Sequence, residues 1–194
     1  MFLEQFPTDG RPSGWIEVIC GSMFSGKTEE LIRRIKRAEF ANQRILLIKP
    51  SIDNRYSEGE IVSHSGLQVN AIVVENSKSI MEQWNGEQIV AIDEAQFFDA
   101  YLIDVCNSLA NKGVRVVVAG LDMDYKGKPF GPIPSLMAIA EYVTKVHAIC
   151  VACGNLAQFS HRFANETSQV LVGAVEKYKP LCRNCYNKYQ LPIE

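Results

Sequence analysis

A glycine-rich segment near the N-terminus, Gly21-Ser22-Met23-Phe24-Ser25-Gly26-Lys27-Thr28, has the spacing of a Walker A phosphate-binding loop. Its glycines let backbone N–H groups converge on phosphate oxygens, and a helix that begins there adds the partial positive charge of its N-terminus. Lys27 would reach the β- and γ-phosphates, and Thr28 would offer its hydroxyl to Mg²⁺. A chance glycine turn is the alternative, but a strand is expected before the motif and a helix after it, which favours nucleotide binding.

Two adjacent carboxylates, Asp93 and Glu94, follow the short apolar run at 89–92. Such a run is typical of a buried strand, and ligands of open α/β sheets bind at the carboxyl ends of the strands. Asp93 would hold Mg²⁺ directly or through water. Glu94 would act as the general base that accepts a proton from an attacking hydroxyl or water. The alternative is a pair of solvated carboxylates that cap the next element.

Four of the six cysteines form two Cys-x-x-Cys pairs with 28 residues between them, namely Cys150 with Cys153 and Cys182 with Cys185. A tetrahedral Zn²⁺ with four thiolates fits both pairs, and a closed site of this kind would be structural. Redox activity is the alternative, which we disfavour because neither pair is expected at the start of a strong helix. His147 and His161 flank the first pair, and we expect structural or surface roles for them.

Composition limits the classes of partner. The 194 residues carry a formal net charge of -2, with 47% hydrophobic and 22% charged residues, which suits one globular domain with a small appendage. This charge provides no general attraction to nucleic acid or to an anionic membrane. No signal-peptide pattern and no apolar run of ~20 residues is present, so we expect a cytoplasmic protein. Cys20 and Cys106 lie in apolar segments and are expected to be buried free thiols.

The elements that would position these residues alternate along the chain. We expect strands at 15–20, 45–48, 71–74, 89–92 and 114–119, and helices at 27–41, 77–84 with Ser77 as N-cap, and 99–111 closed by Gly113. The polar stretch 49–66 is expected to be a long loop with a functional role. Alternation with short turns predicts parallel strands joined by right-handed crossovers.

Three regions follow from this pattern. Residues 1–14 would be a flexible leader, 15–148 an α/β nucleotide-binding domain, and 149–194 a small zinc-binding domain with a C-terminal tail. In that last region no long helical pattern is visible, and 169–173 is a plausible hairpin strand.

The phosphate loop reading Gly-x-Met-Phe-Ser-Gly-Lys-Thr, the run Asp-Glu-Ala-Gln-Phe-Phe from Asp93 and the two cysteine pairs together resemble the cytosolic, zinc-containing (type II) thymidine kinases. The stretches 53–56, 119–131 and 176–178 fit the same family, and the resemblance runs from about Ile16 to Tyr186. It implies a P-loop (RecA-like) parallel sheet flanked by helices, with a small C-terminal zinc-binding lasso. It also implies Mg²⁺-dependent transfer of the γ-phosphoryl of ATP to the 5′-hydroxyl of thymidine or deoxyuridine, in a homotetramer inhibited by dTTP.

The same resemblance assigns roles to residues. Glu94 would be the catalytic base, and Arg55, with Asp53 as its motif partner, would stabilise charge on the transferred phosphoryl. The residues that would contact the nucleoside are Met23, Leu121, Tyr125 and Phe130 as walls, Phe97 as a stacking ring, backbone near Ser160, Leu171 and Gly173, and Tyr178 at the 3′-hydroxyl. Tyr125 stands where the family often has phenylalanine, and Ser160 where threonine is common. Without the resemblance, the aromatic residues and Met23 would be assigned to the core.

A nucleic-acid-binding ATPase with a zinc ribbon is the competing interpretation. It predicts a strongly basic C-terminal region, whereas residues 147–194 hold five basic and three acidic side chains. A non-catalytic nucleotide sensor is a third interpretation, and it predicts loss of Lys27 or Glu94, both of which are present. The sequence therefore favours a kinase.

Overall fold

The computed structural model describes residues 13–52, 60–62, 68–163 and 177–190. Its centre is a six-stranded sheet in the order β5-β2-β6-β7-β1-β8, in which every neighbouring pair is parallel. The strands are β1 (Trp15–Gly21), β2 (Ile45–Pro50), β5 (Ile72–Val74), β6 (Ile89–Ile92), β7 (Arg115–Gly120) and β8 (Tyr142–Val146). All carboxyl ends therefore meet at one edge, and the five predicted strands are confirmed.

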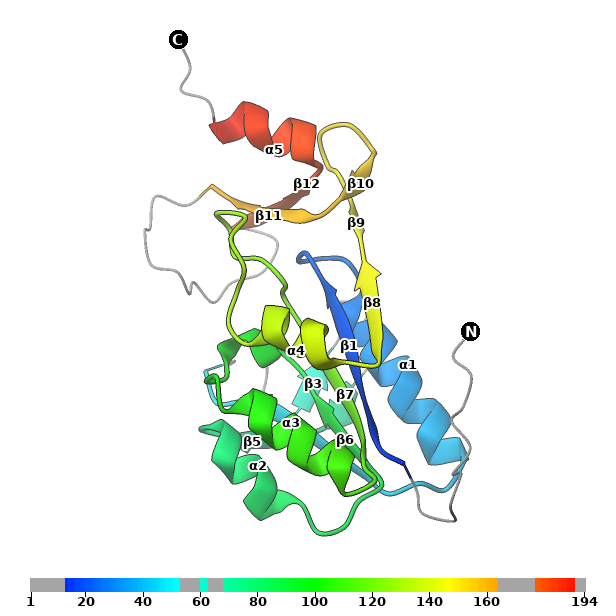
Figure 1. The fold of residues 1–194 in the computed structure, drawn as a ribbon. Helices are drawn as coiled ribbons and strands as arrows, with labels where there is room; N and C mark the ends of the chain where they lie inside the picture. Colours follow the sequence, from blue (N-terminus) through cyan, green and yellow to red (C-terminus); the bar gives the residue numbers. More distant parts are fainter. Residues whose placement is uncertain (1–12, 53–59, 63–67, 164–176, 191–194) are drawn as a thin grey trace.

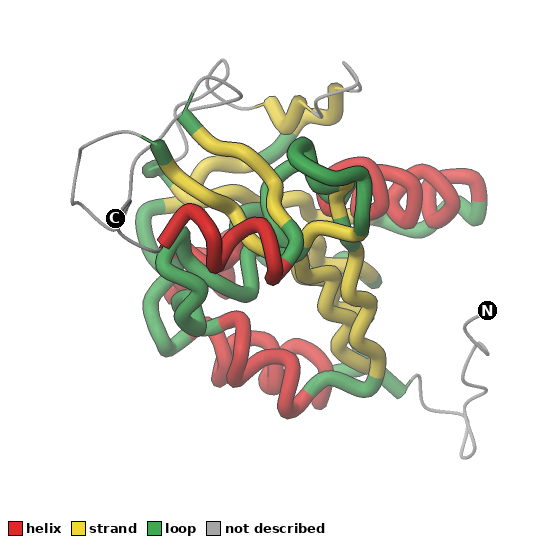
Figure 2. The backbone as a smooth tube through the Cα atoms, turned by 90° about the horizontal axis from the view of Figure 1, so that it is seen from above, coloured by secondary structure: helices red, strands yellow, loops and turns green. Residues whose placement is uncertain are grey.

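Helices cover both faces of this sheet (Figures 1 and 2). Helix α1 (Lys27–Phe40) lies on one face, where Leu31, Ile32 and Ile35 pack against Ile19 and other inward residues of the strands. The opposite face is covered by α2 (Ser77–Gln83), α3 (Leu102–Asn111) and α4 (Ile133–Ile139). Apolar cores on both faces explain why the central strands read as continuous apolar runs.

The three predicted helices are confirmed, although α3 begins at Leu102 and not at residue 99, and the N-cap predicted for α2 is wrong. Asn76, not Ser77, is the N-cap of α2, and its side-chain oxygen accepts the backbone N–H of Ser79 at 3.2 Å. An asparagine at this position satisfies one of the free N–H groups of the first helical turn. Gly113 adopts a φ of 86° after α3, in agreement with the expected glycine stop.

The C-terminal unit lies over the carboxyl edge of the sheet and is reached directly from β8 (Figure 1). It consists of β9 (Ala148–Ile149), β10 (Leu156–Ala157), β11 (Phe159–Arg162), β12 (Tyr178–Leu181) and α5 (Arg183–Gln190). β9 pairs with β10 and β11 with β12, each antiparallel. A small separate core holds the unit together and includes Ala157, Phe159, Leu181 and Tyr186.

Two expectations about irregular regions are wrong. The stretch 49–66 is not a loop throughout, because β3 (Glu60–Val62) pairs antiparallel with β4 (Gln68–Asn70). The C-terminal region does contain a helix, α5, which was not expected because it has only eight residues and a mostly polar sequence. The expected hairpin strand at 169–173 lies outside the described residues.

Candidate active site

The phosphate loop connects β1 to α1, as the motif predicts. Gly26 has a left-handed φ of 83° at the N-terminus of α1, a conformation that glycine adopts without strain. The Lys27 ammonium donates to the backbone oxygen of Ser22 at 2.8 Å, and the Ser25 hydroxyl donates to the same oxygen at 2.7 Å. A pocket opens above the loop and is lined by Met23, Phe24, Ser25, Gly26, Lys27, Thr28, Glu29, Glu94 and Leu121.

The two nucleotide motifs meet at this pocket. The Thr28 hydroxyl oxygen Oγ1 donates to Asp93 Oδ2 at 3.2 Å, although the two residues lie 65 positions apart. Asp93 follows β6 and is only 4% exposed, and its N–H donates to the backbone oxygen of Ile48 in β2. Hard oxygen donors on both sides are the ligand type that Mg²⁺ prefers. The structure thus brings together the two residues predicted to hold the ion.

Glu94 also lines the pocket and has an unusual backbone conformation. Its φ of 50° and ψ of 38° are left-handed, which is uncommon outside glycine and asparagine. A strained non-glycine residue at the end of a sheet strand often belongs to a functional site. The side chain accepts a hydrogen bond from Gln96 Nε2 at 2.5 Å.

Gln96 is the residue that sequence reasoning missed. It lies in the short 3-10 helix η1 (Ala95–Phe97), is 2% exposed, and its Oε1 accepts the N–H of Leu121 at 2.9 Å. The only signal in the sequence was a polar amide inside the otherwise apolar run that follows Glu94, which predicts a buried hydrogen-bonded side chain.

The predicted nucleoside residues form two groups. Met23 and Leu121 share the pocket with Glu94, as expected. Phe97 and Phe130 contact each other edge to face, with ring centroids 5.9 Å apart and an angle of 89° between the planes. This geometry is favourable for aromatic pairs. Phe97 is the last residue of η1, which begins directly after Glu94, the expected general base.

Tyr125 instead contacts the C-terminal unit. Its ring faces the guanidinium of Arg162, with the central carbon 3.5 Å from the ring centroid, and its backbone oxygen accepts the Tyr186 hydroxyl at 2.8 Å. Tyr178 is 7% exposed and lies opposite Arg162 in the β11–β12 pair. Four further predicted residues, Asp53, Arg55, Leu171 and Gly173, lie outside the described residues.

The C-terminal unit also reaches the phosphate loop itself. The Ser160 hydroxyl oxygen accepts the backbone N–H of Met23 at 2.9 Å, and Ser22 Oγ donates to the Ala157 oxygen at 3.4 Å. The sequence analysis assigned only backbone near Ser160 to the base. In the structure its side chain supports the phosphate loop.

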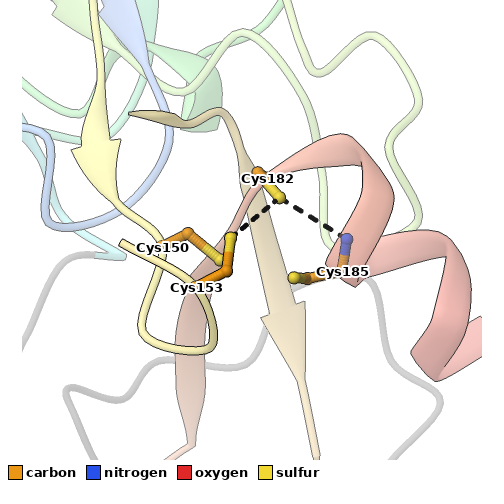
Figure 3. A group of neighbouring side chains, drawn as sticks. All are labelled: Cys150, Cys153, Cys182 and Cys185. Carbon is orange, nitrogen blue, oxygen red and sulfur yellow. Dashed lines mark hydrogen bonds between the residues drawn. The ribbon is translucent and has the colours of Figure 1, made fainter. Parts of the chain in front are cut away.

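The four paired cysteines form one cluster between the β9–β10 turn and the start of α5 (Figure 3). Their sulfur atoms all lie within 4.8 Å of one another, and those of Cys153 and Cys182 are 3.6 Å apart. Four thiolates around Zn²⁺ would have sulfur separations of about 3.8 Å, so the cluster fits a structural metal. Burial alone would raise the pKa of Cys150, but the backbone N–H groups of Cys182 and Ala152 lower it to about 6, whereas the sulfur atoms of Cys153 and Cys182 raise the pKa of Cys185 to about 12.

One argument against redox chemistry is wrong, because α5 begins at Arg183, inside the second cysteine pair. A thiol at a helix N-terminus can be reactive. The convergence of both pairs is what favours a metal instead, since a redox site needs only one pair. The prediction for the remaining thiols is confirmed: Cys20 and Cys106 are free and buried, and burial raises their pKa values to about 11 and about 12.

Comparison with known proteins agrees with this geometry. A family model described as thymidine kinase matches residues 14–186. The thymidine kinase of Bacteroides fragilis strain YCH46 is 59% identical over 188 residues, which is 97% of this chain and 94% of that protein. The proteins of the same name from Bacteroides thetaiotaomicron and Rhodothermus sp. are 58% and 53% identical, over 96% and 91% of this chain and 94% and 83% of their own lengths. The chain belongs to the thymidine kinase family.

Membership in the thymidine kinase family makes the chain an ATP-dependent nucleoside kinase. The matched region runs from the residue before β1 to α5, and it therefore includes the phosphate loop, the pair after β6 and all four clustered cysteines. Within the described part of the chain, no helix is both long and apolar enough to cross a membrane.

Proposed function

We propose that this chain transfers the γ-phosphoryl of ATP to the 5′-hydroxyl of thymidine to give dTMP, and that deoxyuridine is a second acceptor. The observation that carries the proposal is the shared pocket, in which the phosphate loop, the Thr28–Asp93 contact and Glu94 face one another. Phosphoryl transfer needs positioned phosphates, a neutralising cation and a base near the acceptor, and this pocket offers a residue for each.

Lys27 and the N-terminus of α1 would hold the phosphates of ATP, because both present positive charge to the pocket. Thr28 and Asp93 are the proposed ligands of Mg²⁺, which neutralises the charge that develops on the phosphates. Asp53 and Arg55 are proposed, on family resemblance, to stabilise the transferred group.

Glu94 is the proposed general base. A carboxylate that lines the pocket beside the phosphate loop can accept the proton that the 5′-hydroxyl loses as it attacks phosphorus. The Gln96 amide donates to Glu94 Oε2 and would help to hold the carboxylate in place.

The nucleoside would occupy the side of the pocket lined by Met23 and Leu121. Phe97, Phe130 and Tyr125 are proposed, on family resemblance, as its further contacts. Tyr178 and backbone near Ser160, Leu171 and Gly173 are the proposed partners from the C-terminal unit. A unit that covers the carboxyl edge of the sheet would keep water, a competing acceptor, away from the γ-phosphoryl. Zn²⁺ held by the four cysteines would stabilise this C-terminal unit, whose own apolar core is small.

Three further properties belong to the same proposal. A nucleoside triphosphate that carries thymine, dTTP, would place its base in the nucleoside site and its phosphates in the loop, so it is the expected feedback inhibitor. A homotetramer is proposed on family resemblance. A cytoplasmic location is proposed because free and metal-binding thiols persist in a reducing compartment.

The test is ADP release from ATP measured with thymidine, deoxyuridine, deoxyguanosine or single-stranded DNA added separately. The proposal expects stimulation by thymidine, a weaker response to deoxyuridine and none with DNA. Stimulation by DNA and not by thymidine would instead support the ATPase interpretation.

The base is tested by Glu94→Gln, which should lower kcat on the order of a hundredfold while ATP still binds. Glu82→Gln, an exposed carboxylate of α2, is the matched control and should retain full turnover. Unchanged turnover in Glu94→Gln would show that another group accepts the proton.

A further inference from the structure

The Gln96 side chain forms hydrogen bonds with two residues that line the pocket, Glu94 and Leu121. Its Nε2 donates to Glu94 Oε2 at 2.5 Å, and its Oε1 accepts the N–H of Leu121 at 2.9 Å. Leu121 follows β7, the strand that separates β6 from β1 in the sheet. The amide thus links Glu94, just after the end of β6, to Leu121, just after the end of β7, the neighbouring strand in the sheet.

The orientation of this amide follows from its partners. A backbone N–H can only donate, so the Leu121 contact requires the oxygen end of the amide. The NH₂ end must then face Glu94, where a carboxylate accepts. A hydrogen bond to an ionised carboxylate is shorter and stronger than one between neutral groups.

Gln96 also has little freedom to move. A Cβ on Gly120 would lie 2.8 Å from Gln96 Oε1, and a Cβ on Gly131 would lie 2.2 Å from the Gln96 backbone oxygen. Gly120 and Gly131 both lie so close to Gln96 that a larger residue at either position would clash with it. With 2% exposure, the side chain has no water to replace either hydrogen bond.

We propose that Gln96 is a positioning residue that holds the Glu94 carboxylate at the reacting hydroxyl. This inference rests on the proposed function, in which Glu94 is the general base. By holding Oε2, the amide restricts the rotation of the Glu94 side chain, which lines the pocket. Because the same amide also accepts the Leu121 N–H, it sets the position of Glu94 relative to Leu121, a proposed wall of the nucleoside site.

A simpler role would be structural, in which the amide only satisfies the buried N–H of Leu121. Two substitutions separate the roles. Gln96→Glu keeps an oxygen for Leu121 but replaces the donor to Glu94 by a second acceptor that repels it. Gln96→Met has nearly the same shape and removes both hydrogen bonds. Loss of function in Gln96→Glu therefore reports on the contact with Glu94.

The other charged groups around Glu94 do not change in these variants. Lys27 and Glu29 of α1 line the same pocket, Asp93 precedes Glu94, and Lys49 lies near the end of the adjacent strand β2. Gln83→Glu introduces the same substitution at the exposed end of α2 and is the matched control.

The experiment measures kcat and KM for ATP and thymidine, the Kd of ATP, and thermal unfolding. Gln96→Glu and Gln96→Met should each lower kcat by about ten- to a hundredfold, the loss expected when a reacting group is displaced. The Kd of ATP should stay close to wild type in Gln96→Glu, whereas its melting temperature should fall, because the new carboxylate is buried against Glu94. In a Glu94→Gln background, Gln96→Glu should have about no further effect, because residues that act as one unit are not additive.

Two results would overturn the inference. One is wild-type kcat in Gln96→Glu with reduced kcat in Gln96→Met, which would assign the amide to Leu121 alone. The other is a parallel loss of ATP affinity in Gln96→Glu, which would assign the amide to the shape of the whole nucleotide site. If Glu94→Gln itself retains full turnover, the proposed base fails instead, so the two failures are distinguishable.

Discussion

The Ser160 hydroxyl accepts the backbone N–H of Met23 at 2.9 Å, across 137 positions of sequence. Met23 is inside the phosphate loop, and Ser160 is in β11 of the C-terminal unit. Both are largely buried, with exposures of 8% and 5%, so water does not readily substitute for this bond. The metal-binding unit therefore supports the nucleotide site directly.

Ser160→Ala should weaken that support. The substitution leaves a buried N–H without a partner, which costs about 1 to 3 kcal/mol. We expect a lower melting temperature and a higher KM for ATP, measured by thermal unfolding and initial rates. Ser160→Thr keeps the hydroxyl and should stay near wild type. An unchanged KM for ATP in Ser160→Ala would show that the hydrogen bond between Ser160 and Met23 does not hold the phosphate loop in its ATP-binding conformation.

The chemistry-bearing residues were predictable because their motifs are local. The phosphate loop needs only its own glycines and the start of α1, and Asp93 and Glu94 need only the apolar strand before them. Strand β8 was not assigned, because at the sheet edge its side chains are only half buried and it lacks a continuous apolar run. Helix α5 was not assigned because it has only eight residues and is mostly polar, although Cys185 and Tyr186 are buried on one side of it.

Contacts between distant segments could not be predicted in the same way. Nothing in the local sequence links Ser160 to Met23 or Gln96 to Leu121, because both contacts depend on how strand ends and the C-terminal unit come together. The family resemblance named residues of the pocket, and it did not supply these supporting bonds.

Loss of one clustered cysteine should release the metal. Cys182→Ser removes a thiolate from a site whose four sulfur atoms lie within 4.8 Å, and we expect metal content, measured by elemental analysis, to fall from about one ion per chain to far less. Because the small core of the C-terminal unit includes Cys182 and two of the other three cysteines, its protection from proteolysis should fall as well. Cys106→Ala, at a buried thiol of α3, should keep the metal. Full occupancy in Cys182→Ser would contradict a four-thiolate site.

A methyl group at Gly131 should disturb Gln96. Gly131 has a φ of 53°, and an added Cβ would lie 2.2 Å from the Gln96 backbone oxygen. Left-handed backbone alone costs a non-glycine residue about 1 to 2 kcal/mol. Gly131→Ala should therefore lose more stability than that, and kcat should fall with it.

Gly154→Ala is the matched control for Gly131→Ala. Gly154 has a φ of 75°, and an added Cβ there would meet nothing within 4 Å. Chemical denaturation should show only the conformational cost at this position. If both variants lose the same free energy of unfolding, the contact between the added Cβ and Gln96 does not destabilise Gly131→Ala.

A buried carboxylate within β1, Glu17, gives a pH-dependent prediction. Glu17 is 2% exposed and accepts hydrogen bonds from Arg34 and Arg115, each at 2.6 Å, and from Trp15 at 2.7 Å. Burial alone would raise the pKa of Glu17, but the hydrogen bond and charge of Arg115, the Trp15 bond and the charge of Arg34 together lower it. The ionised form is thus favoured in the folded protein.

Since the folded pKa of Glu17 lies below its ordinary value of 4.5, its stabilisation is present above that pH and is lost as the pH falls toward the folded pKa. Glu17→Gln leaves Arg34 buried with fewer partners and should lower the free energy of unfolding at pH 7 by roughly 3 kcal/mol. Urea unfolding from pH 7 to pH 3 should then show a smaller loss of stability in Glu17→Gln than in wild type. Glu39→Gln, an exposed carboxylate of α1, should match the wild-type profile. Parallel pH profiles for Glu17→Gln and wild type would show that Glu17 is not ionised more readily in the folded state.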